Sequence, residues 1–150
     1  MENKEWTFPE YKEKMPDGEW QQEPDKKQWT DEKTKLPCLI VRNPLGALCG
    51  YVGVPPTHPY YQRDYNNCDV SAHGGLTFAG KCHPQEGDRG ICHIAPPEED
   101  EVWWLGFDCA HLGDYVPGMG KFFNEQGTYK HIAYVEDECR ELAEQLIAIK

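Results

Sequence analysis

The stretch that decides the fold is Leu36–Val54, "LPCLIVRNPLGALCGYVGV". Its first part, as far as Arg42, is apolar and rich in β-branched residues, which is typical of a strand. Asn43–Gly46 is typical of a tight turn, because proline fixes φ and glycine accepts a positive φ. The apolar residues from Ala47 onward then predict a returning strand. The sequence therefore predicts an antiparallel β-hairpin.

Further strands are expected on both sides of this hairpin. A polar turn, "TDEKTK", precedes it and predicts one more strand on its N-terminal side. Three other apolar segments predict strands later in the chain, and an acidic turn, "PPEEDE", follows the second of them. These segments are residues 69–80, interrupted by Gly74 and Gly75, residues 91–95 and residues 102–107.

The C-terminal part of the chain has the periodicity of a helix. Its apolar residues recur at alternating spacings of three and four, which places them on one helical face. They are Ile132, Val135, Cys139, Leu142 and Leu146. An amphipathic helix over residues 131–149 is therefore expected to pack on the sheet. The predicted fold class is α+β, with a mainly antiparallel sheet, long loops and one C-terminal helix.

The chain divides into a polar arm and one domain. Residues 1–27 are polar but carry Trp6, Phe8, Tyr11 and Trp20, so we expect an arm that anchors on the core by burying its rings. A partly disordered arm is the alternative. Residues 28–150 are long enough for a single domain with its own core.

Composition limits the classes of partner. The 150 residues carry a formal net charge of −11 and no basic block, which argues against binding of nucleic acid. No apolar run is long enough for a transmembrane helix, so no membrane partner is expected. The first residues, "MENKEW", lack the apolar region of a secretory signal. These features predict a cytoplasmic protein.

The seven cysteines raise two questions: whether their thiols are reduced, and whether some of them bind a structural zinc ion. They are Cys38, Cys49, Cys68, Cys82, Cys92, Cys109 and Cys139. The odd number and the absence of a signal sequence predict reduced thiols. Cysteines and histidines together suggest a structural zinc site, but no Cys-x-x-Cys pair is present. Buried free cysteines that pack as small apolar residues are the alternative.

The main candidate site follows the strand that ends near Phe107. Asp108, His111 and Asp114 are spaced three apart, so a helical turn would place them on one side. His73 on a neighbouring strand could join them. Carboxylates and imidazoles can bind Zn²⁺ or Mn²⁺, or can transfer protons, which makes these four the candidate catalytic and metal residues. Alternatively, the carboxylates only cap their own turn.

Two further segments are candidates for ligand binding. His73, Gly74 and Gly75 combine an imidazole with backbone amides that could cradle a polar group, although a glycine bulge is an equally good interpretation. The loop over residues 55–67 carries His58, Tyr61 and Arg63. Tyrosine rings could stack on a base, and the guanidinium could pair with a phosphate. A loop whose aromatic residues only seal the core is the alternative.

Four strings resemble a family of small uncharacterised proteins encoded by tailed bacteriophages, prophages and some bacteria. They are "EPDKKQW", "LPCLIVRNPLGALCGYVGVPPTHP", "HGGLTFAG" and "WWLGFDCAHLGDYVPG". The resemblance covers nearly all of the chain after about residue 16. It implies a phage-derived accessory protein in the host bacterial cytoplasm. By analogy, such a protein could counter a host defence, but origin alone does not establish a function.

Three functions are compatible with these observations. The first is an accessory protein that binds a small, nucleotide-like molecule in a polar pocket formed by His58, Tyr61, Arg63, His73, Gly74, Gly75, Asp108 and His111. The second is a metal-dependent hydrolase that uses His73, Asp108, His111 and Asp114. The third is an acidic inhibitor that binds a host protein. The sequence leaves open whether the protein is an enzyme and whether it forms homo-oligomers.

Overall fold

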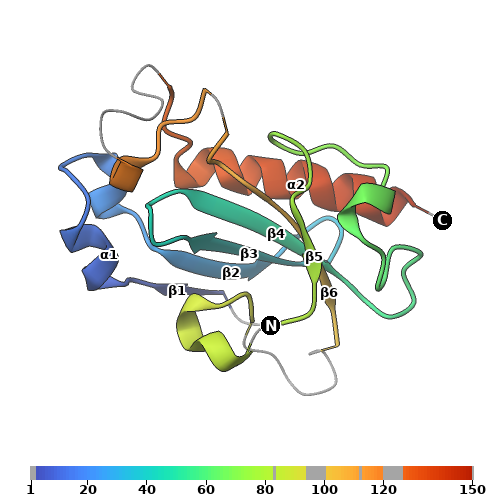
Figure 1. Ribbon diagram of the computed structural model, residues 1–150. Coiled ribbons are helices and arrows are strands. Elements are labelled where there is room, and N and C mark those ends of the chain that lie inside the picture. Colours follow the sequence, from blue (N-terminus) through green and yellow to red (C-terminus); the bar gives the residue numbers. More distant parts are fainter. Residues whose placement is uncertain (1–2, 83, 94–100, 112, 120–126, 150) are drawn as a thin grey trace.

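The computed structural model describes residues 3–82, 84–93, 101–111, 113–119 and 127–149. They form a six-stranded antiparallel sheet with one long helix packed on it (Figure 1), which confirms the α+β fold class. The strands are β1 (Lys4–Trp6), β2 (Lys26–Thr30), β3 (Pro37–Arg42), β4 (Leu48–Val54), β5 (Phe78–Gly80) and β6 (Trp103–Asp108).

The long helix is the one that the apolar periodicity predicts. It is α2 (Ile132–Ala148), and the other α-helix, α1 (Pro9–Glu13), is short. The described residues also include the 3₁₀ helices η1 (Glu19–Gln22), η2 (Tyr65–Asn67), η3 (Pro84–Arg89) and η5 (Pro117–Met119). None of the described helices is both long enough and apolar enough to span a bilayer.

The predicted hairpin lies at the centre of the sheet. The strand order is β1-β2-β3-β4-β6-β5, and Ile40 of β3 pairs with Gly50 of β4. The turn between them closes as expected, because the side chain of Asn43 accepts hydrogen bonds from the backbone N–H groups of Leu45 and Ala47. The preceding polar turn also forms, because the Asp31 carboxylate accepts a hydrogen bond from the backbone N–H of Thr34 and β2 pairs with β3. Both predictions are confirmed.

Both faces of the sheet carry buried apolar side chains. On the face that α2 covers, Ile40, Val52 and Leu105 pack against the helix, with Leu142 fully buried. A second cluster on the other face is centred on Trp104, which is fully buried. Because neighbouring strand residues point to opposite faces, Trp103 packs against the first cluster instead. The two neighbouring tryptophans therefore serve opposite faces of the sheet.

The helix can approach the sheet closely because β4 has a glycine at the contact. A Cβ added to Gly50 would lie 2.5 Å from Cζ of Phe107 and 2.8 Å from Sγ of Cys139. Any larger residue would therefore push α2 away from β4. The glycine serves the packing of the core rather than a ligand.

Two predicted strands differ from the structure. Of residues 69–80, only Phe78–Gly80 form a strand, because Gly74 and Gly75 have φ values of 69° and 87° and turn the chain away from the sheet. Ile91, Cys92 and His93 have no strand structure. The rest of that predicted strand, and the acidic turn as far as residue 100, lie outside the described residues.

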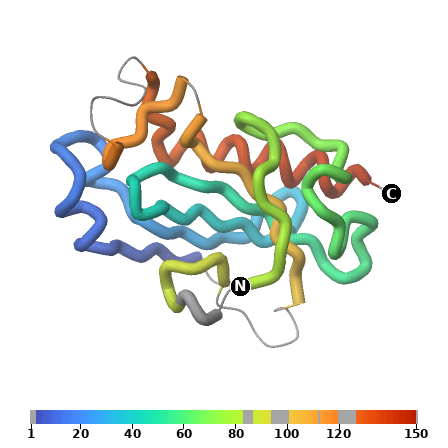
Figure 2. Tube along the Cα trace, in the orientation of Figure 1, coloured from blue at the N-terminus to red at the C-terminus, as the bar shows by residue number. Residues whose placement is uncertain are grey.

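The N-terminal segment takes part in the sheet. Strand β1 pairs antiparallel with β2, and Figure 2 shows this segment running beside β2. Two of its aromatic side chains, Phe8 and Trp20, are buried. The boundary predicted at residue 27 falls inside β2, so the first residues add an edge strand to the sheet.

The thiols are not all reduced. Cys82 and Cys92 form a disulfide, with their Cα atoms 4.7 Å apart, so the prediction of seven reduced thiols is wrong for this pair. The half-buried Cys68 and the four buried cysteines are free. Disulfide sulfurs do not serve as thiolate ligands, so these two cysteines cannot contribute to a zinc site in this state. His83 lies outside the described residues.

Candidate functional site

The structure brings four predicted site residues together. His73 comes from the loop before β5, Asp108 ends β6, and His111 and Asp114 follow in the next loop. The ring centroids of His73 and His111 lie 5.9 Å apart. We call His73, Asp108, His111 and Asp114 the paired-histidine site, because each imidazole lies beside one carboxylate.

The first pair in this site extends to a third residue. Nε2 of His73 lies 2.9 Å from both carboxylate oxygens of Asp114, and Nδ1 lies 2.7 Å from the hydroxyl of Tyr134. Asp114 is almost fully buried, whereas the His73 side chain is 16% exposed. The result is a chain of a carboxylate, an imidazole and a phenol that leads from the interior toward α2.

The second pair is more exposed. Nε2 of His111 lies 3.3 Å from Oδ1 of Asp108, and both side chains are 31% exposed. Asp108 also accepts hydrogen bonds from the hydroxyl of Thr77 at 3.1 Å and from the backbone N–H of Ala110 at 3.1 Å. Gly74 packs directly on the His111 ring, which a Cβ at that position would overlap. Gly74 is therefore needed for the two loops to meet.

Hydrogen bonds keep the buried carboxylate ionised. Burial of Asp114 opposes ionisation, but hydrogen bonds from His73, from the backbone N–H of His111 and from Lys130 lower its pKa below the ordinary value. The Lys130 ammonium is 3.2 Å from Oδ1 of Asp114. Burial and the charge of Glu138 raise the pKa of Tyr134 above its ordinary value. Asp114 is thus an anion and Tyr134 a neutral phenol at neutral pH.

The contacts of Asp114 are compatible with both roles considered for it, as a member of a functional site and as a cap of its own turn. Its carboxylate accepts from the backbone N–H of His111 at 3.0 Å, which is the capping role considered from the sequence. The same carboxylate orients His73.

Among the residues that the structure describes, no three His, Cys, Asp or Glu side chains are arranged to hold a metal ion. The hydrolase that uses Zn²⁺ or Mn²⁺ stays a prediction from the sequence.

The loop with His58, Tyr61 and Arg63 lies elsewhere. Nε2 of His58 donates a hydrogen bond to the backbone carbonyl of Leu146 in α2. Leu146 is twelve residues, or about 18 Å of helix, from Tyr134, which contacts the paired-histidine site. The backbone carbonyl of Arg63 accepts a hydrogen bond from the Trp103 indole, at the opposite end of β6 from Asp108. The predicted pocket that joined this loop to the paired-histidine site is therefore not formed.

The Tyr61 and Arg63 side chains have local roles. Tyr61 contacts the Trp103 ring, with centroids 6.3 Å apart, and the Arg63 guanidinium lies over the Tyr60 ring. These contacts match the alternative in which aromatic residues of the loop cover the edge of the core. Gly74, by contrast, packs on the His111 ring of the paired-histidine site, whereas a Cβ added at Gly75 would meet nothing within 4 Å.

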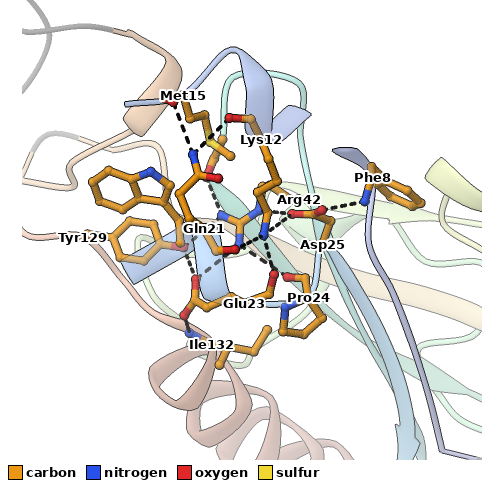
Figure 3. Close-up of polar contacts among 12 residues, drawn as sticks. Phe8, Lys12, Met15, Gln21, Glu23, Pro24, Asp25, Arg42, Tyr129 and Ile132 are labelled. Atoms are coloured by element: carbon orange, nitrogen blue, oxygen red, sulfur yellow. Dashed lines mark hydrogen bonds and ion pairs between the residues drawn. The ribbon is translucent and has the colours of Figure 1, made fainter. Parts of the chain in front are cut away.

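A second polar cluster, which the sequence interpretation missed, surrounds Arg42 (Figure 3). The buried guanidinium donates to Asp25 at 2.7 Å and to Glu23 at 3.2 Å. It also donates to the hydroxyl of Tyr129 and to the backbone carbonyls of Pro24 and Gly46. All of its donor groups are satisfied, so this cluster holds segments together rather than offering a binding site.

A cavity of about 130 Å³ has a lining that includes no residue of the paired-histidine site and none that bonds Arg42. Its lining consists of Asn3, Lys27, Trp29, Glu136 and Arg140. Its cations already face carboxylates, since Lys27 is 2.5 Å from Glu136 and Arg140 is 2.6 Å from Asp137. The cavity contains none of the predicted site residues.

Three residues of the candidate site were not predicted: Thr77, Lys130 and Tyr134. Tyr134 lies in the first turn of α2, where the apolar periodicity draws attention only to the face that contacts the sheet. No local sequence signal places it beside His73, because the contact joins segments 61 residues apart.

Comparison with known protein families, with curated proteins and with solved structures finds no match.

Proposed function

We propose that this protein binds a small, nucleotide-like molecule at the paired-histidine site. The observation that carries the proposal is the meeting of two histidine–carboxylate pairs, with ring centroids 5.9 Å apart. Asp108 and His111 are partly open to solvent, and Asp114 lies behind them in the interior. Polar groups that converge at the surface from several loops are typical of ligand sites.

The chemistry of the site supports a ligand with both rings and hydrogen-bonding groups. Imidazole and phenol rings offer flat surfaces for a planar group, and the half-exposed carboxylate of Asp108 accepts hydrogen bonds. A nucleobase combines both features. The role as a phage accessory protein, which only the resemblance implies, stays a prediction.

Titration calorimetry with adenosine, guanosine and cytidine and with their 5′-monophosphates tests the proposal. Asp108→Asn and His111→Gln should each weaken binding by about tenfold or more, because each removes or alters one polar partner in the site. Their melting temperatures should stay close to that of the wild type, since both side chains are partly exposed.

Asp64→Asn is the matched control, because Asp64 is exposed and lies on the loop at the far end of α2. It should bind each probe as the wild type does. If the wild type binds none of the six compounds, or if the two site variants bind as well as the control, the proposal is wrong.

A further inference from the structure

We propose that the Tyr134 hydroxyl is the ligand-contacting end of the Asp114–His73 pair and presents a hydrogen-bond acceptor to donor groups on the ligand. This inference rests on the proposed function and names the part of the ligand that the site recognises. The donors are the amino and imino groups of a nucleobase, and the phosphate is not recognised.

The first step is that His73 has no ring nitrogen left for a ligand. Nε2 faces the two oxygens of Asp114 and Nδ1 faces the hydroxyl of Tyr134, both within hydrogen-bonding distance. The ring also packs edge-on against the Tyr134 ring, with centroids 5.4 Å apart. His73 can therefore act on a ligand only through Tyr134.

The second step assigns the protons in the hydrogen bonds that link Asp114, His73 and Tyr134. Asp114 is ionised and can only accept, so we assign His73 the tautomer in which Nε2 carries the proton and donates it to the carboxylate. Nδ1 then has a lone pair and accepts the O–H of Tyr134. The tautomer follows from the hydrogen-bond network rather than from observed hydrogens.

The third step concerns the phenol oxygen. Its only hydrogen is committed to His73, so its remaining lone pairs can accept. Within the described part of the chain, no side chain or backbone group donates to this oxygen. Tyr134 is half-buried against the core, which fixes the position of the hydroxyl.

The fourth step is the charge around this oxygen. The paired-histidine site carries the carboxylates of Asp108 and Asp114, and the charges of Glu138 and Glu141 also act on Tyr134. The ammonium of Lys130 lies 5.9 Å from the centre of the Tyr134 ring but is held by Asp114 at 3.2 Å. The surroundings are thus acceptor-rich and have no cation to spare among these groups. A phosphate would be repelled, whereas N–H donors of a base would be bound.

The variant Tyr134→Phe tests this inference by titration calorimetry with the three nucleosides and their 5′-monophosphates. It keeps the ring that packs on His73 and removes the oxygen. We expect the wild type to bind nucleosides more tightly than the monophosphates, and inorganic phosphate not to compete. Tyr134→Phe should weaken nucleoside binding by about tenfold. Tyr65→Phe, which removes an exposed phenol at the far end of α2, should bind as the wild type does.

Two results separate this inference from the proposed function. If Tyr134→Phe binds normally while Asp108→Asn binds weakly, the site stands and the role of Tyr134 is refuted. Tighter binding of monophosphates than of nucleosides refutes the recognition of donors. Failure of every probe to bind the wild type refutes both proposals.

A measurement without ligand gives an independent check. The ¹⁵N chemical shifts of the His73 ring should show a protonated Nε2 and an accepting Nδ1. In Tyr134→Phe the Nδ1 shift should change, because its hydrogen-bond donor is gone. A protonated Nδ1 in the wild type at neutral pH would reverse the direction of the Tyr134 hydrogen bond and overturn the inference.

Discussion

Arg42 shows how a charged residue can end an apolar strand. It is only 1% exposed, yet its guanidinium meets two carboxylates, a phenol and two carbonyls. Burial of an ion is costly unless every donor has a partner, and here every donor does. The sequence shows only an arginine after "PCLIV", which is also how an exposed strand end would look.

The substitution Arg42→Met should lower the free energy of unfolding by about 3–5 kcal/mol, because it removes the guanidinium from the nearly buried Glu23 and leaves the buried Asp25 with only the Lys12 ammonium, 3.6 Å away. Urea denaturation measures the change. Arg140→Met is the matched control, since the exposed ion pair of Arg140 with Asp137 should contribute no more than about 0.5 kcal/mol. Equal effects of the two substitutions would contradict this account of Arg42.

Lys26 is a second buried cation, but its partners are neutral. Its ammonium donates to the backbone carbonyls of Asp88 and Gly90, at 2.8 and 2.9 Å, and lies over the Trp6 ring. Burial lowers the pKa of Lys26 from 10.5 to about 8. The folded protein therefore loses this proton at a lower pH than the unfolded chain does.

Between pH 8 and 10.5 the unfolded chain binds more protons at this lysine, so the contribution of Lys26 to stability rises with pH. Relative to Lys26→Met, the wild type should gain stability across this interval, by about 3 kcal/mol at most. Urea denaturation at several pH values measures the difference. Lys33→Met, which removes an exposed lysine, should follow the wild type in parallel. A constant difference between the wild type and Lys26→Met would show that the pKa is not lowered.

At the scale of elements, the loop that Lys26 holds is also closed covalently. The disulfide between Cys82 and Cys92 spans η3, and Ile91 beside it packs on the second face of the sheet. On this face the loop contributes packing as well as hydrogen bonds. The loop is thus fixed at its ends by a covalent bond and in its middle by Lys26.

Removing this disulfide with Cys82→Ser and Cys92→Ser together should cost about 2–3 kcal/mol of unfolding free energy, because the crosslink restricts a sequence separation of 10 residues in the unfolded chain. Chemical denaturation with and without a reductant measures it. Reductant should lower the stability of the wild type to that of the double variant and leave the double variant unchanged. Cys68→Ser, at a half-buried free thiol, is the control. No effect of reductant on the wild type would contradict the crosslink.

Elements with a strong local pattern could be predicted from the sequence, and elements that depend on distant partners could not. The hairpin of β3 and β4 has a turn signal between apolar runs, and α2 has five apolar residues on one face. The segment before β5 alternates apolar residues (Val70, Ala72 and Leu76) with polar ones, but Gly74 and Gly75 turn it toward His111. Whether paired glycines bulge a strand or end it depends on that contact, which lies outside the segment.

At the scale of the whole molecule, the same distinction applies to the candidate site. Asp108, His111 and Asp114 do lie close together, but the described residues between Asp108 and Asp114 form bends and a turn instead of the helical turn assumed from their spacing. His73 joins them from a neighbouring segment. The loop with His58 was misplaced because composition does not tell which end of the sheet a loop covers. Tyr134 and Lys130 were missed because they reach His73 and Asp114 from another segment of the chain, which no local pattern reveals.

The cluster around Arg42 also sets the order in which the molecule can be completed. Glu23 accepts a hydrogen bond from the backbone N–H of Ile132, the first residue of α2, across a sequence separation of 109 residues. The central hairpin closes through local contacts, whereas this link joins parts of the described chain that are far apart in sequence, at a larger cost in entropy. During synthesis, the segment with Glu23 leaves the ribosome long before α2 is made. One face of the sheet therefore stays uncovered until α2 has been synthesised, and the exposed apolar surface favours aggregation during that interval.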